Sequence, residues 1–526
     1  MQESEGIKEK DFIKEDEVKK KILLMTVLIL ALVAGEGRCQ EKEILSLSLE
    51  ECLAKALKNN LQVAVEVYNP ELADIAVTRA REIFTPRFEM NYGSEHQESP
   101  PYWWIQGENN IVTKISDYGI SLKQQIPTGG NFSLSLTNYK SDTNQAFQLI
   151  NPRYESAFRI DFVQPLLKNF GFKVNRQQIL QAQNNLEISN NQLQNVILDT
   201  LYFVEESYWN LVHAIEDFKV KQQSLELGRD LLAKNKREVE LGQIAPIEIL
   251  NAEAVVASRE ADLIQAEALI TRNEELLKTL INLSAEGGVH LKKIVPSDRP
   301  GFQEVDLSLD QALKTAMDLR PDLQIQKKNM ESKDLNLKVA RNQMLPGLDM
   351  QFSYWSPGIS GDQLLYKDDN PLSGEIIGRE KGNSWDSFRD AFKLLYKNWN
   401  VGLTLSIPLS NFLTKAEYAY AQVELNQSLA RLKSLEQQVA LEISDAVRSV
   451  ETNAKRVEAY RVARELAEKR LEAEEKKLKV GLSINYFVLE YQDSLANAKS
   501  MELKALVDYN LSLARLKKAM GTSLEK

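Results

Sequence analysis

Two very long stretches of the chain contain no proline. One lies between Pro165 and Pro246, and the other runs from Pro408 to the C-terminal Lys526. Helices in ordinary globular domains have about 11–12 residues, and breaking residues normally end them. A continuous helix over residues 172–241 would be about 105 Å long at 1.5 Å per residue. The sequence therefore predicts helices far longer than those of an ordinary globular domain.

Each long stretch also shows the apolar spacing of a helix seam and ends at a glycine. The glycines are Gly242 and Gly481, and glycine commonly follows the last turn of a helix. We expect each arm to turn back there, which gives helical hairpins over 172–283 and 409–520. The apolar seams step by three, four or seven residues, as in a coiled coil: Leu186, Leu193, Val196 and Phe203 in the first, and Ile443, Val447, Val450, Ala454 and Val457 in the second.

The chain contains an internal duplication. Similar landmarks recur in the same order in both halves, at offsets that fall from 260 to 239 residues. Fixed order over such a distance is the signature of a structural repeat. We expect a first repeat over 46–283, a linker over 284–305 and a second repeat over 306–521. The matching landmarks are LSLEECL at 47–53 with LSLDQAL at 307–313, QPL at 164–166 with IPL at 407–409, and LG at 241–242 with VG at 480–481.

Each repeat is predicted to begin with a helix and to continue with strands. Ser48 and Ser308 stand at capping-box spacing from Glu51 and Gln311. The helices should end before Pro86 and Pro346, because the residue before a proline disfavours helix.

Beyond these prolines the apolar period changes to two, which predicts strands with one apolar and one polar face over about 87–165 and 347–407. Thr128-Gly129-Gly130 is predicted to form a hairpin turn. The first segment is longer than the second, and the excess is an extra hairpin at about 117–139. Whether this hairpin joins the sheet or lies outside it remains open at this point.

The N-terminus resembles a secretory signal. The apolar run at 22–34 follows three lysines and is too short to span a bilayer. Small residues precede a cut after Gly37, which predicts a signal peptide over 1–37. Since the residues ahead of the lysines are acidic, we expect the true start downstream, near Val18. The alternatives are a cytosolic protein with a buried apolar helix, and lipidation of Cys39, which Arg38 disfavours.

The composition excludes several classes of protein. Asp and Glu number 75 against 65 Lys and Arg, a net charge of −10, so nucleic-acid binding is not expected. With 2 Cys and 3 isolated His, neither a disulfide framework nor a metal cluster is expected. The mean hydropathy of −0.35 argues against a multi-helix membrane protein. No P-loop, G-x-S-x-G or H-E-x-x-H motif occurs, so we expect no enzyme and no cofactor.

Secreted strands with one apolar face suit the wall of a β-barrel. A sheet of a few strands from one chain cannot close around water, and open edges are not tolerated in lipid. The membrane interpretation therefore requires further copies of the chain. The alternative is a secreted or periplasmic coiled-coil structural protein without a pore.

Taken together, the landmarks resemble the TolC-like outer-membrane efflux protein family. They are the duplicated LSL start, the Ala80-Arg81…Pro86 entry to the strands, the Gln164-Pro165-Leu166-Leu167…Phe170-Gly171 exit, and the glycine tips. The resemblance covers about 46–521. It implies a mainly α protein that forms a homotrimer, with pooled strands in one outer-membrane β-barrel and helical hairpins in a periplasmic α-barrel tunnel. The family usually has two strands per repeat and twelve in the barrel.

The resemblance also implies a function without bond chemistry. Such proteins are passive exit ducts of tripartite efflux pumps or type I secretion systems in the outer membrane. Their partners are outer-membrane lipid, a periplasmic adaptor protein and an inner-membrane transporter. What passes through is not indicated.

Site residues carried over from the family lie at the two tips. The implied constriction residues are Phe487 and Glu490, and the family's cross-linking basic residue falls on Ser483, so its salt-bridge lock is not expected here. The plainer alternatives are helix C-caps for the glycines and a solvated carboxylate for Glu490. The implied adaptor-docking residues are Gly242, Glu248, Gly481 and Ser483.

Overall fold

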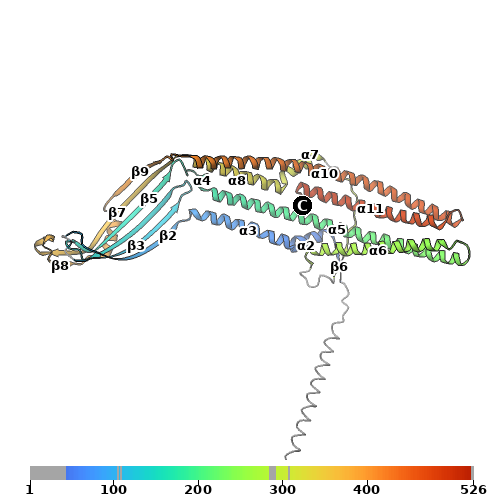
Figure 1. Ribbon diagram of the computed structural model, residues 1–526, viewed down its shortest axis with the longest axis horizontal. Coiled ribbons are helices and arrows are strands. Elements are labelled where there is room, and N and C mark those ends of the chain that lie inside the picture. Colours follow the sequence, from blue (N-terminus) through green and yellow to red (C-terminus); the bar gives the residue numbers. More distant parts are fainter. Residues whose placement is uncertain (1–42, 104–105, 107–108, 284–291, 306–307, 523–526) are drawn as a thin grey trace, which may run out of the picture. The chain divides into compact units, whose positions relative to one another are not determined.

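The structure is a computed structural model that describes residues 43–103, 106, 109–283, 292–305 and 308–522 (Figure 1). The described part is mainly helical and contains one large antiparallel sheet, which confirms the predicted fold class. The predicted signal peptide over 1–37 and Cys39 lie outside the described residues. In the part described, no helix combines the length and the apolar character needed to cross a bilayer.

The chain divides into two compact units, and each is considered by itself. Helices α5 (Gln177–Glu240), α10 (Phe412–Lys479) and α11 (Asn485–Met520) contribute residues to both. The first unit comprises residues up to Asn60, Phe203–Gln303 and Asn453–Leu511, and the second comprises Leu61–Tyr202, Glu304–Thr452 and residues from Ser512 onward.

The first unit is built around a small apolar core beside a parallel strand pair. β1 (Glu43–Leu47) pairs with β6 (Lys292–Pro296), which lies within the segment predicted as a linker. The hydroxyl of Tyr208 donates to the Asp298 carboxylate at 2.9 Å, lies 3.2 Å from the Leu47 carbonyl, and accepts from the Asp298 backbone amide at 3.2 Å. These bonds satisfy a side chain that is otherwise fully buried. The core around it contains Cys52, Ala56, Val204, Leu211, Leu277 and Ile281.

The predicted capping box is present in one repeat only. In α2 (Leu49–Asn59) the Ser48 hydroxyl accepts from the Glu51 amide, and the Glu51 carboxylate accepts from the Ser48 amide. This confirms the prediction for Ser48. In α7 (Leu309–Leu319) Ser308 occupies the predicted N-cap position, but its side chain makes no capping bond, so only the capping box predicted there was wrong.

Each predicted first helix is divided into two. Asn60 and Arg320 have extended backbones, with ψ of 125° and 122°, and an extended residue interrupts the helical ladder. Two further helices follow them, α3 (Leu61–Arg81), which contains Pro70, and α8 (Pro321–Gln343). The prediction of one continuous helix before Pro86 and Pro346 was therefore wrong.

The second unit holds a seven-stranded antiparallel sheet, whose main strands lie side by side in Figure 1. The order is β2-β3-β4-β5-β7-β8, and β9 also pairs with β7. The short helix α9 (Ser384–Phe392) packs on the sheet through buried Ser387 and Ala391. The strands are β2 (Arg87–Ser99), β3 (Ile111–Gln125), β4 (Asn131–Thr143), β5 (Ile150–Pro165), β7 (Gly347–Tyr366), β8 (Ile376–Glu380) and β9 (Asn398–Ser406).

The extra hairpin of the first repeat is part of this sheet. β3 and β4 are joined by the predicted turn, in which the Ile126 amide donates to the Gly130 carbonyl at 2.7 Å. β2 pairs with β3 over the whole length of β2, and β4 pairs with β5. The hairpin therefore separates the two strands that would otherwise be neighbours.

Candidate functional site

In the part of the strands next to the helices, the sheet has one apolar face that crosses six strands without a break. Nearer the other end of the strands, the same face carries the hydrogen-bonded Asn138 and Ser156 and is covered by α9. Residues that oppose each other in an antiparallel ladder lie on the same face, so the pairing register gives the composition of that face. The opposite face of the sheet is polar and includes Glu89, Asn91, Ser121, Ser133, Ser135, Asp161, Gln351, Asn400 and Thr404. The apolar face of the sheet carries the following residues, given strand by strand from β2 to β9: Phe88, Met90 and Tyr92; Tyr118, Ile120 and Leu122; Phe132, Leu134 and Leu136; Phe158, Ile160 and Phe162; Leu348, Met350, Phe352 and Tyr354; and Trp399, Val401, Leu403 and Leu405.

The two outer strands of this face are unpaired on one side within the described residues. β2 pairs only with β3, and β9 pairs only with β7. Their large apolar side chains are exposed, and Met90 and Leu403 are exposed at 71% and 69%. A row of free backbone groups beside exposed apolar side chains is a template for pairing with another strand.

The two predicted tips have the same backbone geometry. Gly242 and Gly481 have positive φ values of 71° and 76°, a conformation that glycine adopts without steric cost. The backbone amide of the next residue donates to the carbonyl five positions earlier, from Gln243 to Glu238 at 2.8 Å and from Leu482 to Lys477 at 2.9 Å. This is a Schellman motif. Both glycines are thus helix-ending residues, as their plainer interpretation predicted, and both are exposed.

The other two predicted docking residues have separate local roles. Glu248 lies in the first turn of α6 (Ile247–Leu280), where a carboxylate is favoured by the helix dipole. Ser483 donates its hydroxyl to the Glu474 carboxylate at 2.5 Å, and Lys477 binds the same carboxylate at 3.0 Å. The structure therefore gives Ser483 an acidic partner within its own hairpin.

The Ser483 hydroxyl, and then the Lys477 ammonium, lower the pKa of Glu474 below its usual value. A carboxyl with a lowered folded-state pKa stabilises the fold above its unfolded pKa and loses this contribution as pH falls through the lowered value. Ser483→Ala should therefore weaken hydrogen-exchange protection at the second tip at pH 7. It should also move the acid loss of protection to higher pH. The measurement is exchange mass spectrometry of tip peptides between pH 7 and pH 3, corrected for intrinsic rates.

The first tip supplies the control, because Asn235 and Ile244 stand where the second has Glu474 and Ser483. Protection of the first tip should be unaffected by Ser483→Ala. An unchanged pH profile at the second tip would contradict the role assigned to Ser483.

The predicted constriction residues lie on one face of α11. Phe487 and Glu490 are three residues apart and exposed, whereas Val488 and Leu489 between them are buried. Phe487 makes an edge-to-face contact with Tyr486, with ring centroids 5.7 Å apart. Within one copy of the chain, both side chains are therefore available to a surface that the copy does not itself cover.

The two hairpins are tied together by polar residues that the sequence did not predict. Arg259 of α6 is 5% exposed. Its Nε lies 3.0 Å from the Asp493 carboxylate of α11, and its Nη1 donates to the Ser224 carbonyl of α5 at 2.6 Å. Nearer the tips, the side-chain amide nitrogen of Asn485 donates to the side-chain oxygen of Asn235 at 2.6 Å. One guanidinium thus joins three helices.

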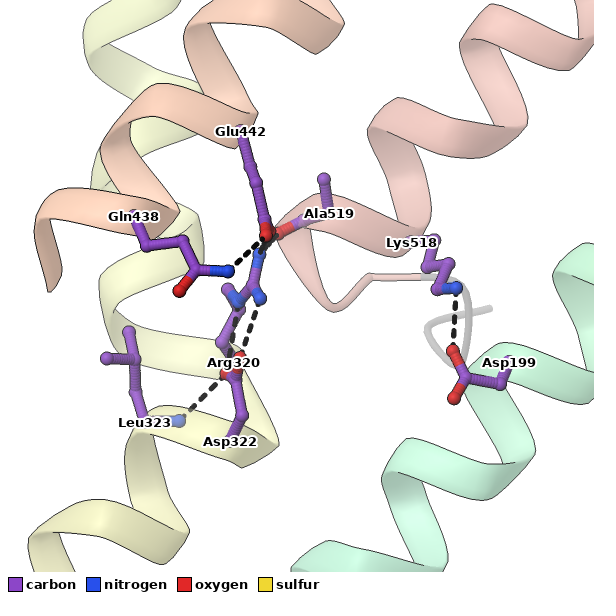
Figure 2. Close-up of polar contacts among 8 residues, drawn as sticks. All are labelled: Asp199, Arg320, Asp322, Leu323, Gln438, Glu442, Lys518 and Ala519. Carbon is purple, nitrogen blue, oxygen red and sulfur yellow. Dashed lines mark hydrogen bonds and ion pairs between the residues drawn. The ribbon is translucent and has the colours of Figure 1, made fainter. Parts of the chain in front are cut away.

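A further link holds the end of each returning helix, and it has the same form in both repeats. The side chain of Asn60 donates to the Leu280 carbonyl at 2.8 Å at the end of α6. That of Arg320 donates to the Ala519 carbonyl at 3.3 Å at the end of α11 (Figure 2). Asn60 and Arg320 are 260 residues apart, and Leu280 and Ala519 are 239 apart, which are the offsets of the duplication. We call each such contact a clasp.

The second clasp is charged. Arg320 also lies 2.6 Å from the Asp322 carboxylate and 2.8 Å from that of Glu442 in α10 (Figure 2). Nearby, Lys518 lies 2.7 Å from Asp199. The first clasp uses a neutral amide instead, so the duplicated position has kept its geometry but not its charge.

The described residues include no group of three or more His, Cys, Asp or Glu side chains that could hold a metal ion. The polar clusters serve as links between helices.

Comparisons with known proteins agree with this geometry. The family model described as outer membrane efflux protein matches residues 52–283 and 312–522. The Outer membrane protein TolC of Escherichia coli (strain K12) is 24% identical over 340 residues, which cover 63% of this chain and 62% of that protein. The match thus spans less than two thirds of the length of this curated relative.

Solved structures show the same fold. A membrane protein from Pseudomonas aeruginosa superposes with a TM-score of 0.64 at 15% identity, over 91% of this chain and 95% of that chain. The Campylobacter jejuni CmeC outer membrane channel gives a TM-score of 0.61 at 15% identity, over 90% of this chain and 85% of that chain. The open state of the Neisseria gonorrhoeae MtrE outer membrane channel gives a TM-score of 0.59 at 18% identity, over 90% of this chain and 89% of that chain.

Proposed function

Because this chain belongs to the outer membrane efflux protein family, we propose that it is the passive exit duct of a tripartite efflux pump or a type I secretion system. Family membership confirms the predicted outer-membrane location and the prediction that the protein is not an enzyme. The observation that carries the proposal is the sheet with one unbroken apolar face and two open edges.

The open edges support a homo-oligomer, which we propose to be a trimer. Backbone groups within lipid must be paired, because no water is present to satisfy them. β2 of one copy and β9 of another are the strands with free edges in the described sheet, so their pairing would satisfy both. The apolar face then contacts lipid, and the polar face lines the water-filled lumen.

The helical hairpins are proposed to form the periplasmic tunnel of the oligomer. Phe487 and Glu490 are exposed in one copy, which suits side chains that meet their equivalents around a threefold axis. They would give an apolar ring followed by an acidic ring at the constriction. Converging carboxylates favour cations in a narrow pore.

The two tips are proposed to dock a periplasmic adaptor protein. Gly242 and Gly481 form two exposed turns of identical hydrogen bonding, and Glu248 and Ser483 lie beside them. An inner-membrane transporter would supply the energy for transport, since this chain contains no nucleotide-binding motif.

The proposal is tested by conductance of the purified protein in planar bilayers. Phe487→Ala should raise the single-channel conductance, because a smaller ring widens the constriction. Glu490→Gln should lower the preference for cations over anions. Glu475→Gln is the matched control, since Glu475 is exposed on α10 of the same hairpin, and it should leave selectivity unchanged.

Two results would contradict the proposal. One is recovery of the native protein in the soluble periplasmic fraction, which the alternative of a coiled-coil structural protein without a pore predicts. The other is the absence of channels even with Phe487→Ala. The unbroken apolar face of the sheet favours the duct over that alternative.

A further inference from the structure

We propose that the membrane wall of this protein contains eighteen strands, six from each of three copies, because the β3–β4 hairpin is built into it. The proposal rests on the trimeric duct proposed above. It concerns a surface formed between copies of this chain, and it assigns the hairpin the function of widening the outer mouth. The partner for each open edge is a second copy of the chain.

The first observation is the continuity of pairing. β2 pairs with β3 from Arg87↔Lys123 to Ser99↔Ile111, and β4 pairs with β5 from Asn131↔Val163 to Ser141↔Arg153. β2 and β5 are not neighbours in the sheet. A hairpin that lay outside the wall would leave those two strands paired with each other.

The second observation is the continuity of the faces. In β3, Ile120 lies opposite Met90 on one side and Leu136 on the other. The polar residues Ser121 and Ser135 oppose each other on the other face. The hairpin therefore contributes the same apolar and polar faces as the strands around it, which a strand exposed to water on both sides would not need.

The third observation identifies which strands form the wall at the apolar band. β8 pairs with β7 only at Gln363–Tyr366, whereas β9 pairs with β7 over Gly347–Trp355. The apolar-face residues Leu348, Met350, Phe352 and Tyr354 of β7 lie in the second of these segments. β9 is therefore the edge of the sheet at that level, and β2, β3, β4, β5, β7 and β9 form the wall.

Strand direction allows this sheet to close on its copies. β2 follows helix α3, and β9 leads into helix α10, so the two strands run in opposite directions between the helical end and the outer end of the sheet. Pairing β9 of one copy with β2 of the next continues the antiparallel pattern. An even number of strands per copy meets this condition for any number of copies.

The consequence is a wider mouth. The diameter of a barrel grows roughly linearly with strand number, so eighteen strands give a wall about 1.5 times as wide as twelve, and walls of 16–18 strands enclose an aqueous channel. Without the hairpin, each copy would contribute four strands. The outer mouth should thus admit solutes about 1.5 times as wide as a four-strand sheet would allow.

Deletion of residues 111–143, joining Asn110 to Asn144, tests this consequence. β2 and β5 could then pair with their apolar faces on the same side. In planar bilayers, polyethylene glycols of graded size are added to each side in turn, and entry is read as reduced conductance. The largest polymer that enters the outer mouth should have a radius about one third smaller in the deletion variant. An unchanged cut-off would overturn the proposal.

A second measurement keeps the proposal testable if the deletion variant does not fold. In the full chain, Ser135→Cys should react with a membrane-impermeant thiosulfonate and reduce conductance, because its side chain faces the lumen. Leu136→Cys should react only with a lipid-soluble maleimide. Equal reaction of both variants with the impermeant reagent would place the hairpin outside the wall and overturn the proposal.

Cys39→Ser is the background for both labelling variants, and the chain with this change alone is the labelling control, in which Cys52 is the remaining native cysteine. Burial, with the nearby Glu51 carboxylate, raises the pKa of the Cys52 thiol to about 12, so this cysteine contributes little thiolate. Failure of the inference is distinguishable from failure of the proposed function. If the unmodified protein forms no channel, the duct itself is wrong; if it conducts but the labelling pattern is equal, only the strand number is wrong.

Discussion

Replacing Asp493 by alanine is expected to lower the free energy of unfolding by about 2–4 kcal/mol. The substitution leaves the Arg259 guanidinium buried, with the Ser224 carbonyl as its remaining strong partner. Removing one partner of a fully buried ion pair costs about 3–5 kcal/mol. The Asp493 side chain is 46% exposed, so the expected loss is somewhat smaller. Urea unfolding of the detergent-purified protein, followed by helical circular dichroism, measures it.

A double substitution separates the charge from the packing. Arg259→Met with Asp493→Leu should cost less than about 1 kcal/mol, because apolar residues of similar volume can replace a buried pair with little loss. Glu260→Ala is the matched control. It breaks the Arg229–Glu260 pair, which has a 2.6 Å contact but side chains exposed at 58% and 46%, and should cost about 0–1 kcal/mol. Equal losses for Asp493→Ala and Glu260→Ala would contradict this assignment.

Asp493→Ala should also affect conduction. Arg259 and Asp493 join the return helices of the two hairpins, so their separation should raise the open probability of the channel in bilayers. The double apolar variant should keep the hairpins packed and remain close to the native open probability. A rise in both variants would indicate that the ion pair is not what holds the hairpins.

Replacing Arg320 by methionine is the second large effect. Its guanidinium contacts Asp322, Glu442 and the Ala519 carbonyl (Figure 2). Without it, two carboxylates lie close together without a cation, and the carbonyl loses a donor. Since Glu442 is 42% exposed, water compensates part of the loss, and we expect a cost of about 2–4 kcal/mol in the same unfolding measurement.

The neutral clasp and a nearby surface pair provide two comparisons. Asn60→Leu removes the hydrogen bond to the Leu280 carbonyl and should cost about 1–3 kcal/mol. Lys518→Met breaks a more exposed pair with Asp199 and should cost about 0–1 kcal/mol, an effect that falls in high salt. A cost for Arg320→Met no larger than that for Lys518→Met would show that the clasp does not stabilise the fold.

The long helices and the strands were predictable because their signals are local. The absence of proline after Pro408 and the alternation around Leu403 each depend on residues that are neighbours in sequence. The turn at Gly129 and the cap at Ser48 were predictable for the same reason, since each depends on residues that are close in sequence. The missing capping bond at Ser308 and the break at Asn60 show the limit of this reasoning. The break at Arg320 has a local cause that was overlooked, because Pro321 follows it and disfavours helix at the preceding residue.

The polar links between helices were not predictable in the same way. Arg259 and Asp493 are separated by 234 residues, and nothing near either position indicates its partner. The clasps are an exception. The two offsets of the duplication relate Asn60 to Arg320 and Leu280 to Ala519, so comparison of the repeats could have related the two pairs once either contact was known. Of the predicted tip and constriction residues, Glu248 and Ser483 are half-buried and the others are exposed. The functional roles of all of them stay predictions.

The open edges of the sheet also determine how such a protein must be made. A newly released copy carries two unpaired strands and a broad apolar face, β2 and β9 being its free edges. Those features attract any other extended chain as readily as the correct one. Assembly and aggregation thus compete for the same surfaces, and both depend on the concentration of copies. The yield of functional protein should therefore depend on how fast copies find one another, as well as on the stability of each fold.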